Sequence, residues 1–345
     1  MSFLSDNTAP VAPAIMEALE AANRGSAAAY GDDPWTARLD AVFSEIFERP
    51  VRVFPLVTGT AANAIAAAVL SPPYGAVFVH EEAHMEVDEC GAPEFFTGGA
   101  KLGLVAGTHG RMSAEGLRQA LARYYRSVHM VEPAAVSLTQ STELGTVYRP
   151  ADIAAIAEVA RGRGMRLHMD GARFANALVH LGCAPADISW RAGVDVMSFG
   201  ATKNGALAAE ALIYFDPALV RDTAWRRKRA GHLVSKMRYV SAQLLAYVEN
   251  DLWRANAAHA NAMAARIAAA AGSRLIHPVE ANALFLALDE AEKQALREAG
   301  FGFYDWGAPG SPVVRLVTHW ASEEGEVERF IAALKGLARA ALSEH

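Results

Sequence analysis

The sequence predicts an α/β fold with a mostly parallel, seven-stranded sheet, followed by a small C-terminal α+β domain. Between residues 51 and 215, apolar runs of strand length alternate with helical runs, which is typical of a parallel sheet covered on both faces. Past Gly272 the pattern changes to strands interleaved with two helices. We therefore expect a large domain at 1–250, with an N-terminal arm at 1–30, and a small domain at 251–345.

Composition narrows the class of protein. The chain has 345 residues, of which 52% are hydrophobic and 20% charged, and a formal net charge of −6. This balance argues against a nucleic-acid or acidic-membrane surface, and no apolar run approaches the roughly 20 residues of a membrane span. The two cysteines lack ligand-type spacing, so we expect no metal site. The N-terminus carries no export signal, and we expect a cytoplasmic protein that binds a small molecule and further copies of itself.

Two helices are expected before the first strand, one after Pro10 and one opened by Pro34. The turn between them reads Tyr30-Gly31-Asp32-Asp33. An aromatic ring and two carboxylates before a helix are either a simple helix lead-in or a functional loop, and Tyr30 is the candidate if the loop is functional.

The first strand, at 51–57, leads into a potential anion site. Thr58, Gly59 and Thr60 stand between this strand and an alanine-rich helix. Free backbone amides and the helix dipole at such a start attract a phosphate. The alternative is that Thr58 or Thr60 only caps the helix.

The second strand, at 76–79, is followed by a polar segment with two histidines and five carboxylates at 80–91. His84 and Asp88 belong to it. The metalloprotease order of residues is absent, so a metal site is not favoured. An imidazole at this strand end would either stack on a flat ligand or lie in a solvated loop.

Further strands are expected at 101–106, 135–139 and 166–170, with helices at 113–125 and 151–161 between them. His129 precedes the strand at 135–139 and could be an ordinary surface histidine.

Asp170 and Lys203 follow two strands that should be neighbours. Asp170 ends the strand at 166–170. Lys203 follows the strand at 195–199 after a short turn of small residues, between Thr202 and Asn204. Carboxyl ends of strands in such a sheet open into one crevice. A lysine there can bind the aldehyde of pyridoxal phosphate, and a carboxylate can pair with the pyridine nitrogen. The alternatives are a solvated lysine and an aspartate that caps a helix.

The strand at 209–215 follows too closely for a crossover helix and should pair antiparallel. A basic helical stretch around Lys228 comes next, and the small domain should contain strands at 274–277, 283–288 and 313–318. Arg315 lies within the last of these apolar strands, where a guanidinium needs an anion. An internal carboxylate or a bound substrate carboxylate would serve.

Several motifs in order along the chain resemble the fold type I, aspartate aminotransferase-like pyridoxal-phosphate enzymes. The likeness is greatest to the low-specificity L-threonine aldolases, including their phenylserine aldolase branch. The motifs are Ser5-Asp6-Asn7, Ala29-Tyr30-Gly31-Asp32-Asp33, Gly59-Thr60-Ala61-Ala62-Asn63, Glu82-Ala83-His84, Asp88-Glu89-Cys90-Gly91, His168-Met169-Asp170-Gly171-Ala172-Arg173 and Thr202-Lys203-Asn204-Gly205. Aldolases outside this branch often have Glu-Asn-Thr-His where this chain reads Thr139-Gln140-Ser141-Thr142.

The resemblance implies a cleavage of threonine, allo-threonine or phenylserine into glycine and an aldehyde. It also implies roles for particular residues. The cofactor would be bound by Lys203, Asp170, Gly59, Thr60, His84, Arg173 and Thr202, and the substrate by Ser5, Arg173, Arg315 and Tyr30. The base would be His129, held near Asp88, with His84 as the second choice.

The resemblance further implies a homodimer or homotetramer with its sites at a subunit interface, where Tyr30 and the residues near Lys228 serve the neighbouring subunit. Fold alone leaves other reactions open, namely transamination, β-elimination and racemisation, and also a silent relative that binds the cofactor without turnover.

Overall fold

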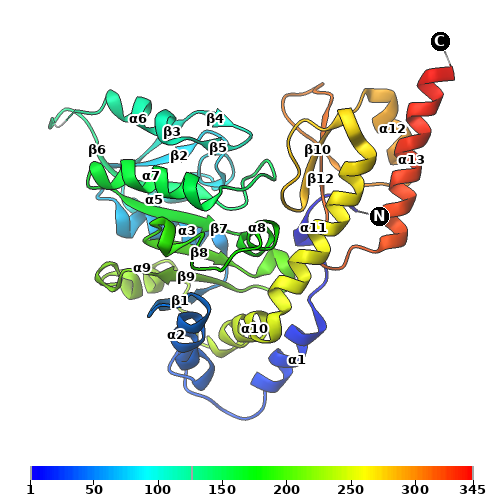
Figure 1. Ribbon diagram of the computed structural model, residues 1–345. Helices are drawn as coiled ribbons and strands as arrows, with labels where there is room; N and C mark the ends of the chain where they lie inside the picture. The colour runs from blue at the N-terminus through cyan, green and yellow to red at the C-terminus, as the bar shows by residue number, and fades with distance from the viewer. Residues whose placement is uncertain (1, 126, 344–345) are drawn as a thin grey trace.

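The computed structural model describes residues 2–125 and 127–343, and a seven-stranded sheet forms the centre of that part of the chain (Figure 1). Its strands follow one another across the sheet in the order β1 (Arg52–Leu56), β9 (Glu210–Tyr214), β8 (Val196–Gly200), β7 (Arg166–Gly171), β6 (Glu132–Thr139), β2 (Gly75–His80) and β3 (Lys101–Val105). The five strands from β8 to β3 pair in parallel, and β9 is antiparallel to β8 and β1. The predicted α/β sheet, with its one antiparallel strand, is confirmed.

Helices cover both faces of this sheet because its strands are apolar on both sides. In β2, Val77 and Val79 pack on the face covered by α3, whereas Phe78 packs on the opposite face. The first face carries α3 (Gly59–Leu70), α4 (His84–Val87), α5 (Ala92–Thr97) and α9 (Thr223–Arg229). The opposite face carries α1 (Pro13–Ala22), α2 (Pro34–Ile46), α6 (Ala114–Ala122), α7 (Pro150–Gly162), α8 (Phe174–Leu181) and α10 (Arg238–Val248).

A second, three-stranded antiparallel sheet forms a separate core. Its order is β10 (Ala283–Ala287), β12 (Val313–Val317) and β11 (Tyr304–Asp305). It packs with α11 (Leu252–Ala271), α12 (Glu290–Glu298) and α13 (Glu324–Ser343), and Figure 1 shows α11 running from the large sheet to the small one. Asn250 and Asp251, both with φ of 57°, separate α10 from α11. The domain boundary at 250/251 stays a prediction.

The N-terminal arm is attached to the small sheet. Phe3 is fully buried in the core of the small sheet, and its backbone exchanges hydrogen bonds with Gly302 and Val317. A 3-10 turn, η1 (Asp6–Thr8), follows and brings Asp6 toward the large sheet. The arm therefore connects the two sheets before α1 begins.

One predicted strand is wrong. Residues 274–277 form only a single bridge, between Leu275 and Leu286, after the turn η6 (Gly272–Arg274). Pro278 cannot donate a backbone hydrogen bond, and Arg274 is held in an ion pair with Glu292. The segment therefore runs beside β10 without extending the sheet.

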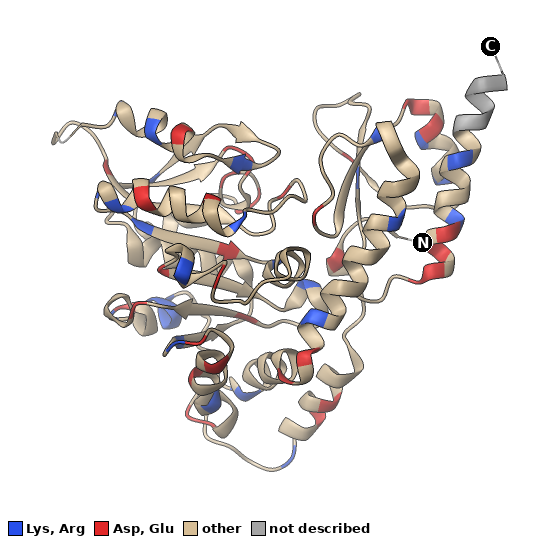
Figure 2. Ribbon diagram, viewed as in Figure 1, with Lys and Arg blue, Asp and Glu red and all other residues tan. Residues whose placement is uncertain are grey.

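Charged residues of both signs are interspersed along the helices (Figure 2). Among the described residues, no helix combines the length and the hydrophobicity that a bilayer span requires.

Candidate active site

Asp170 and Lys203 line one cavity of about 260 Å³ at the carboxyl ends of β7 and β8. The two strands are neighbours, with Asp170 opposite Ser198. Lys203 lies in the short turn η3 (Thr202–Asn204) that follows β8. The parallel pairing of two adjacent strands thus brings the two side chains to the same end of the sheet.

Asp170 is held in a fixed position. It is 5% exposed, and its Oδ2 accepts a hydrogen bond of 2.8 Å from Asn63 Nδ2. The backbone N–H of Ala172 donates to Oδ1 at 3.0 Å. The carboxylate can therefore present a lone pair to a positively charged ring nitrogen without reorienting.

Lys203 is half-buried and unpaired. Its amine makes no hydrogen bond or ion pair with any residue in the described part of the chain. Burial lowers the pKa of Lys203, and the charge of Arg173 lowers it further. A lowered pKa provides more of the neutral amine, which is the form that attacks an aldehyde.

His84 takes part in a chain of hydrogen bonds that ends at Asp170. Its Nδ1 lies 2.9 Å from Glu89 Oε1, and Asn63 Nδ2 donates to the same oxygen at 2.8 Å. Asn63 in turn bonds Asp170. The bond to Glu89 raises the pKa of His84. His84 Nε2 lies 3.6 Å from Asp88 Oδ2.

A second acidic residue, Glu143, binds the backbone of His84. The N–H of His84 donates to Glu143 Oε1 at 2.7 Å, and Glu143 Oε2 is buried without a partner among the described residues. Burial raises the pKa of Glu143 to about 7. Glu143 lines the same cavity.

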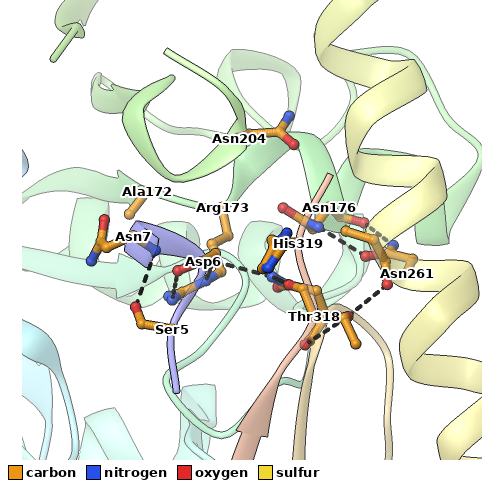
Figure 3. A network of polar contacts seen from close by, with 12 residues as sticks. Ser5, Asp6, Asn7, Ala172, Arg173, Asn176, Asn204, Asn261, Thr318 and His319 are labelled. Carbon is orange, nitrogen blue, oxygen red and sulfur yellow. Dashed lines mark hydrogen bonds and ion pairs between the residues drawn. The ribbon is translucent and has the colours of Figure 1, made fainter. Parts of the chain in front are cut away.

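Arg173 lies at the other side of the cavity, bound to the N-terminal arm. Its Nε and Nη2 donate to the two oxygens of Asp6 at 2.7 and 2.9 Å. Figure 3 shows the two side chains facing one another, with Ser5 and Asn7 on the same turn. Burial opposes the charge on Asp6, but the charge and hydrogen bonds of Arg173 outweigh it and lower its pKa.

Arg315, on β12, has no acidic partner within the described residues, and its Nε is buried without a hydrogen bond. The guanidinium lies 5.4 Å from the centre of the Trp306 ring. Burial lowers its pKa to about 10, with a further contribution from Arg173. The charges of Arg173 and Asp6 both act on Arg315, and a guanidinium without an acidic partner can bind an anion.

The start of α3 also opens into the cavity. Thr58 caps this helix, because its Oγ1 accepts from the N–H of Ala61 at 3.2 Å. Gly59 and Thr60 line the cavity together with Thr58. The helix cap and the anion site that the sequence suggested are thus compatible. Thr58 provides the cap, and the start of the helix still faces the cavity.

The cavity lining lacks five of the predicted residues: Ser5, Tyr30, Asp88, His129 and Arg315. His129 is an exposed residue before the amino end of β6, so the length of that strand separates it from Asp170 by roughly 25 Å. Asp88 lies beside His84 and not beside His129. Tyr30 is 50% exposed and contacts Lys228, whose Nζ is 4.7 Å from the ring centre.

Sequence reasoning missed several polar residues of the cavity: Asn63, Glu89, Glu143 and Glu210. Asn63 and Glu89 stand within motifs that were noted, but nothing in the sequence separates Glu89 from the four other carboxylates of its segment. Glu210 is the one charged residue in the apolar strand at 209–215, and this isolated charge could have indicated a functional residue.

Comparisons with known proteins agree with this arrangement. The beta-eliminating lyase family matches residues 2–291. A low specificity L-threonine aldolase of Pseudomonas aeruginosa is 44% identical over 325 residues, covering 93% of each chain. One from another Pseudomonas species is 42% identical over 339 residues, covering 97% of each. A solved threonine aldolase of Leishmania major superposes with a TM-score of 0.91 at 32% identity, covering 97% of this chain and 99% of the other.

Proposed function

The chain belongs to the beta-eliminating lyase family, among its low specificity L-threonine aldolases, and from this premise we propose that it cleaves β-hydroxy-α-amino acids to glycine and an aldehyde. The observation that carries the proposal is the unpaired, half-buried Lys203 that shares a cavity with the fixed carboxylate of Asp170. Threonine, allo-threonine and phenylserine are the candidate substrates.

The residues of the cavity fit pyridoxal phosphate. Lys203 would bind its aldehyde, Asp170 its ring nitrogen, and the start of α3 at Gly59 and Thr60 its phosphate. His84 would lie against the ring and Thr202 beside its attachment point. When bound, this cofactor accepts the electron pair of the bond that breaks at Cα.

Arg315 and Arg173 would bind the substrate carboxylate, with Ser5 at the edge of the site. Arg315 is the stronger candidate because its charge lacks a carboxylate among the described residues, whereas Arg173 already pairs with Asp6. A carboxylate held at this position fixes rotation about Cα. The residues that hold this carboxylate would therefore set the orientation of the Cα–Cβ bond before it breaks.

A base must remove the proton of the β-hydroxyl group as the Cα–Cβ bond breaks. His84 is available in the same chain, and its bond from Nδ1 to Glu89 would leave Nε2 free to accept that proton. His129, if it is the base, would have to come from a neighbouring copy of the chain. That arrangement requires the proposed homodimer or homotetramer, in which Tyr30 and Lys228 would also reach a neighbouring site.

β-Elimination is the second candidate reaction, since the family description names it. The two reactions release different products from the same substrates. The cofactor-loaded protein should be offered L-threonine and L-phenylserine side by side, and the products identified. Glycine together with acetaldehyde or benzaldehyde supports the aldolase proposal, whereas a 2-oxo acid with ammonia supports elimination and overturns it.

A further inference from the structure

Glu210 places a carboxyl group directly beside the start of α3. It is the first residue of β9, and its neighbours across the sheet are Gly200 on β8 and Leu56 on β1. A Cβ added to Gly59 would lie 3.9 Å from Glu210 Oε2. The residue is 6% exposed and lines the cavity that contains Gly59, Thr60 and Lys203.

The groups around Glu210 do not neutralise it fully. From η3, Thr202 forms hydrogen bonds with the carboxyl group and Lys203 contributes a positive charge. From β7, Asp170 contributes a negative charge, and from α10 the Tyr247 phenol faces it. The facing residues of α3 and β1, Gly59 and Leu56, carry no charge. Burial is the largest influence and raises the pKa of Glu210 to about 7.

An ionised carboxylate at this position would oppose the attraction that the helix start exerts on an anion. The free N–H groups and the dipole of α3 favour a phosphate, and a second negative charge next to it would repel one. A neutral carboxyl group would instead offer an O–H donor to a phosphate oxygen. The two protonation states of Glu210 therefore have opposite effects on a phosphate at the start of α3.

We propose that Glu210 is part of the phosphate-binding site in its neutral form and that its ionisation weakens binding of the phosphate. This inference rests on the proposed pyridoxal-phosphate site but not on the reaction catalysed there. Phosphate binding then involves the uptake of one proton by Glu210. Affinity is constant below the pKa of the free site and falls as the pH rises above it, by up to about tenfold per pH unit.

5-Deoxypyridoxal and pyridoxal phosphate provide the test, because they share the aldehyde and ring and only one of them carries a phosphate. Neither can form the internal hemiacetal of free pyridoxal. The Kd of each should be measured by the absorbance change on binding to the full-length apoprotein, from about pH 6 to about pH 9. The ratio of the two values isolates the phosphate, since effects of pH on Lys203 and on the ring affect both ligands alike.

In the wild type, pyridoxal phosphate should bind more tightly than the ligand without phosphate at low pH. We expect this ratio of affinities to fall about tenfold or more across the pH range. In Glu210→Gln the affinity ratio should no longer fall with pH. It should instead rise slightly as the phosphate loses its second proton, with a pKa near 6. Glu143→Gln is the matched control: its carboxyl also has a pKa of about 7 and lines the same cavity, and it should retain the wild-type decline.

Equal pH dependence of the ratio in the wild type and Glu210→Gln would overturn the inference and leave the aldolase proposal intact. Failure of the wild type to bind either aldehyde would overturn the cofactor assignment and the inference together. Far-ultraviolet circular dichroism and 5-deoxypyridoxal binding establish that each variant is folded. Should Glu210→Gln fail to fold, Glu210→Ala must show the same loss of decline.

Discussion

At the scale of single residues, Arg173 in the cavity lining and Arg315 on β12 differ in how their charges are balanced. Arg173 is neutralised by two hydrogen bonds to Asp6, whereas Arg315 has a buried Nε without any partner in the described chain. A buried charge without a partner destabilises the free protein and is stabilised when an anion binds. This difference supports the proposal that Arg315 binds the substrate carboxylate.

Replacing Arg315 with Met should separate stability from substrate binding. We expect Arg315→Met to leave the melting temperature of the substrate-free protein unchanged or higher, because an uncompensated charge is removed. The KM for L-threonine should rise about tenfold to a hundredfold, the effect of losing hydrogen bonds from a charged group. Arg329→Met, on the exposed face of α13, is the control and should change neither value. An unchanged KM in Arg315→Met would exclude a role in carboxylate binding.

The hydrogen bond between His84 and Glu89 predicts a pH dependence. This bond raises the pKa of His84 above 6.5, and only the neutral imidazole can accept a proton. If His84 is the base, kcat/KM therefore rises as the pH increases through this raised pKa. In Glu89→Gln the negative charge is lost, and the rise should move to lower pH by about one unit.

The measurement is the pH profile of kcat/KM for both proteins, with Glu86→Gln as the control, since Glu86 is an exposed residue on the same helix as His84. An acidic limb that stays in place in Glu89→Gln would show that another group is the base, and His129 would then be the next candidate.

At the scale of elements, the distance between the ends of β7 and β8 determines how Lys203 and Asp170 face one another. Gly200, the last residue of β8, has no room for a side chain, because an added Cβ would lie 2.6 Å from the carbonyl oxygen of Ala172. The backbone approach at this point is therefore as close as a glycine permits. Lys203 follows three residues later.

Gly200→Ala should displace the end of β8 and with it Lys203. We expect a destabilisation of about 1–3 kcal/mol from overpacking, together with slower formation of the absorbance band of bound pyridoxal phosphate. Gly162→Ala, at the end of α7, is the control because an added Cβ meets nothing within 4 Å. If Gly200→Ala keeps the stability and the cofactor binding of the wild type, the close approach of β7 and β8 is not needed to position Lys203.

The alternation of strands and helices was sufficient to predict the large sheet, since each buried strand is a short apolar run followed by a helix. It also predicted that Asp170 and Lys203 would share a crevice. It failed at 274–277, where one proline prevents a ladder. The hydrogen bonds of Asn63, Glu89 and Glu143 join segments distant in the sequence, so local patterns contain no sign of them.

At the scale of the whole molecule, the N-terminal arm connects the cavity at the large sheet with the small sheet. Asp6 joins all three, because it pairs with Arg173 and also accepts a hydrogen bond of 3.1 Å from Asn282 Nδ2 at the start of the small sheet. The loop with His129, by contrast, lies at the opposite end of the parallel strands, before the amino end of β6. A function for His129 in catalysis therefore requires a second copy of the chain, and the assembly and the cytoplasmic location stay predictions.

Hybrid oligomers test this requirement. Lys203→Ala and His129→Ala should each be inactive if His129 acts in the site of a neighbouring copy. Unfolding and refolding the two variants together should then restore up to about a quarter of wild-type activity, because half of the random dimers are mixed and each contains one complete site. Each variant refolded alone is the control. Activity that stays equal to the sum of the two controls would show that His129 does not act in the site of a neighbouring copy.

The most direct test of the account is the amount of glycine and aldehyde formed from L-threonine by the wild type, Lys203→Ala and Asp170→Asn, all supplied with pyridoxal phosphate. We predict equimolar glycine and acetaldehyde from the wild type and a loss of at least about a thousandfold in Lys203→Ala. Asp170→Asn should still bind the cofactor but cleave slowly. Undiminished, equimolar release of both products by Lys203→Ala would contradict the account, because the cleavage would then proceed without the lysine on which the site depends.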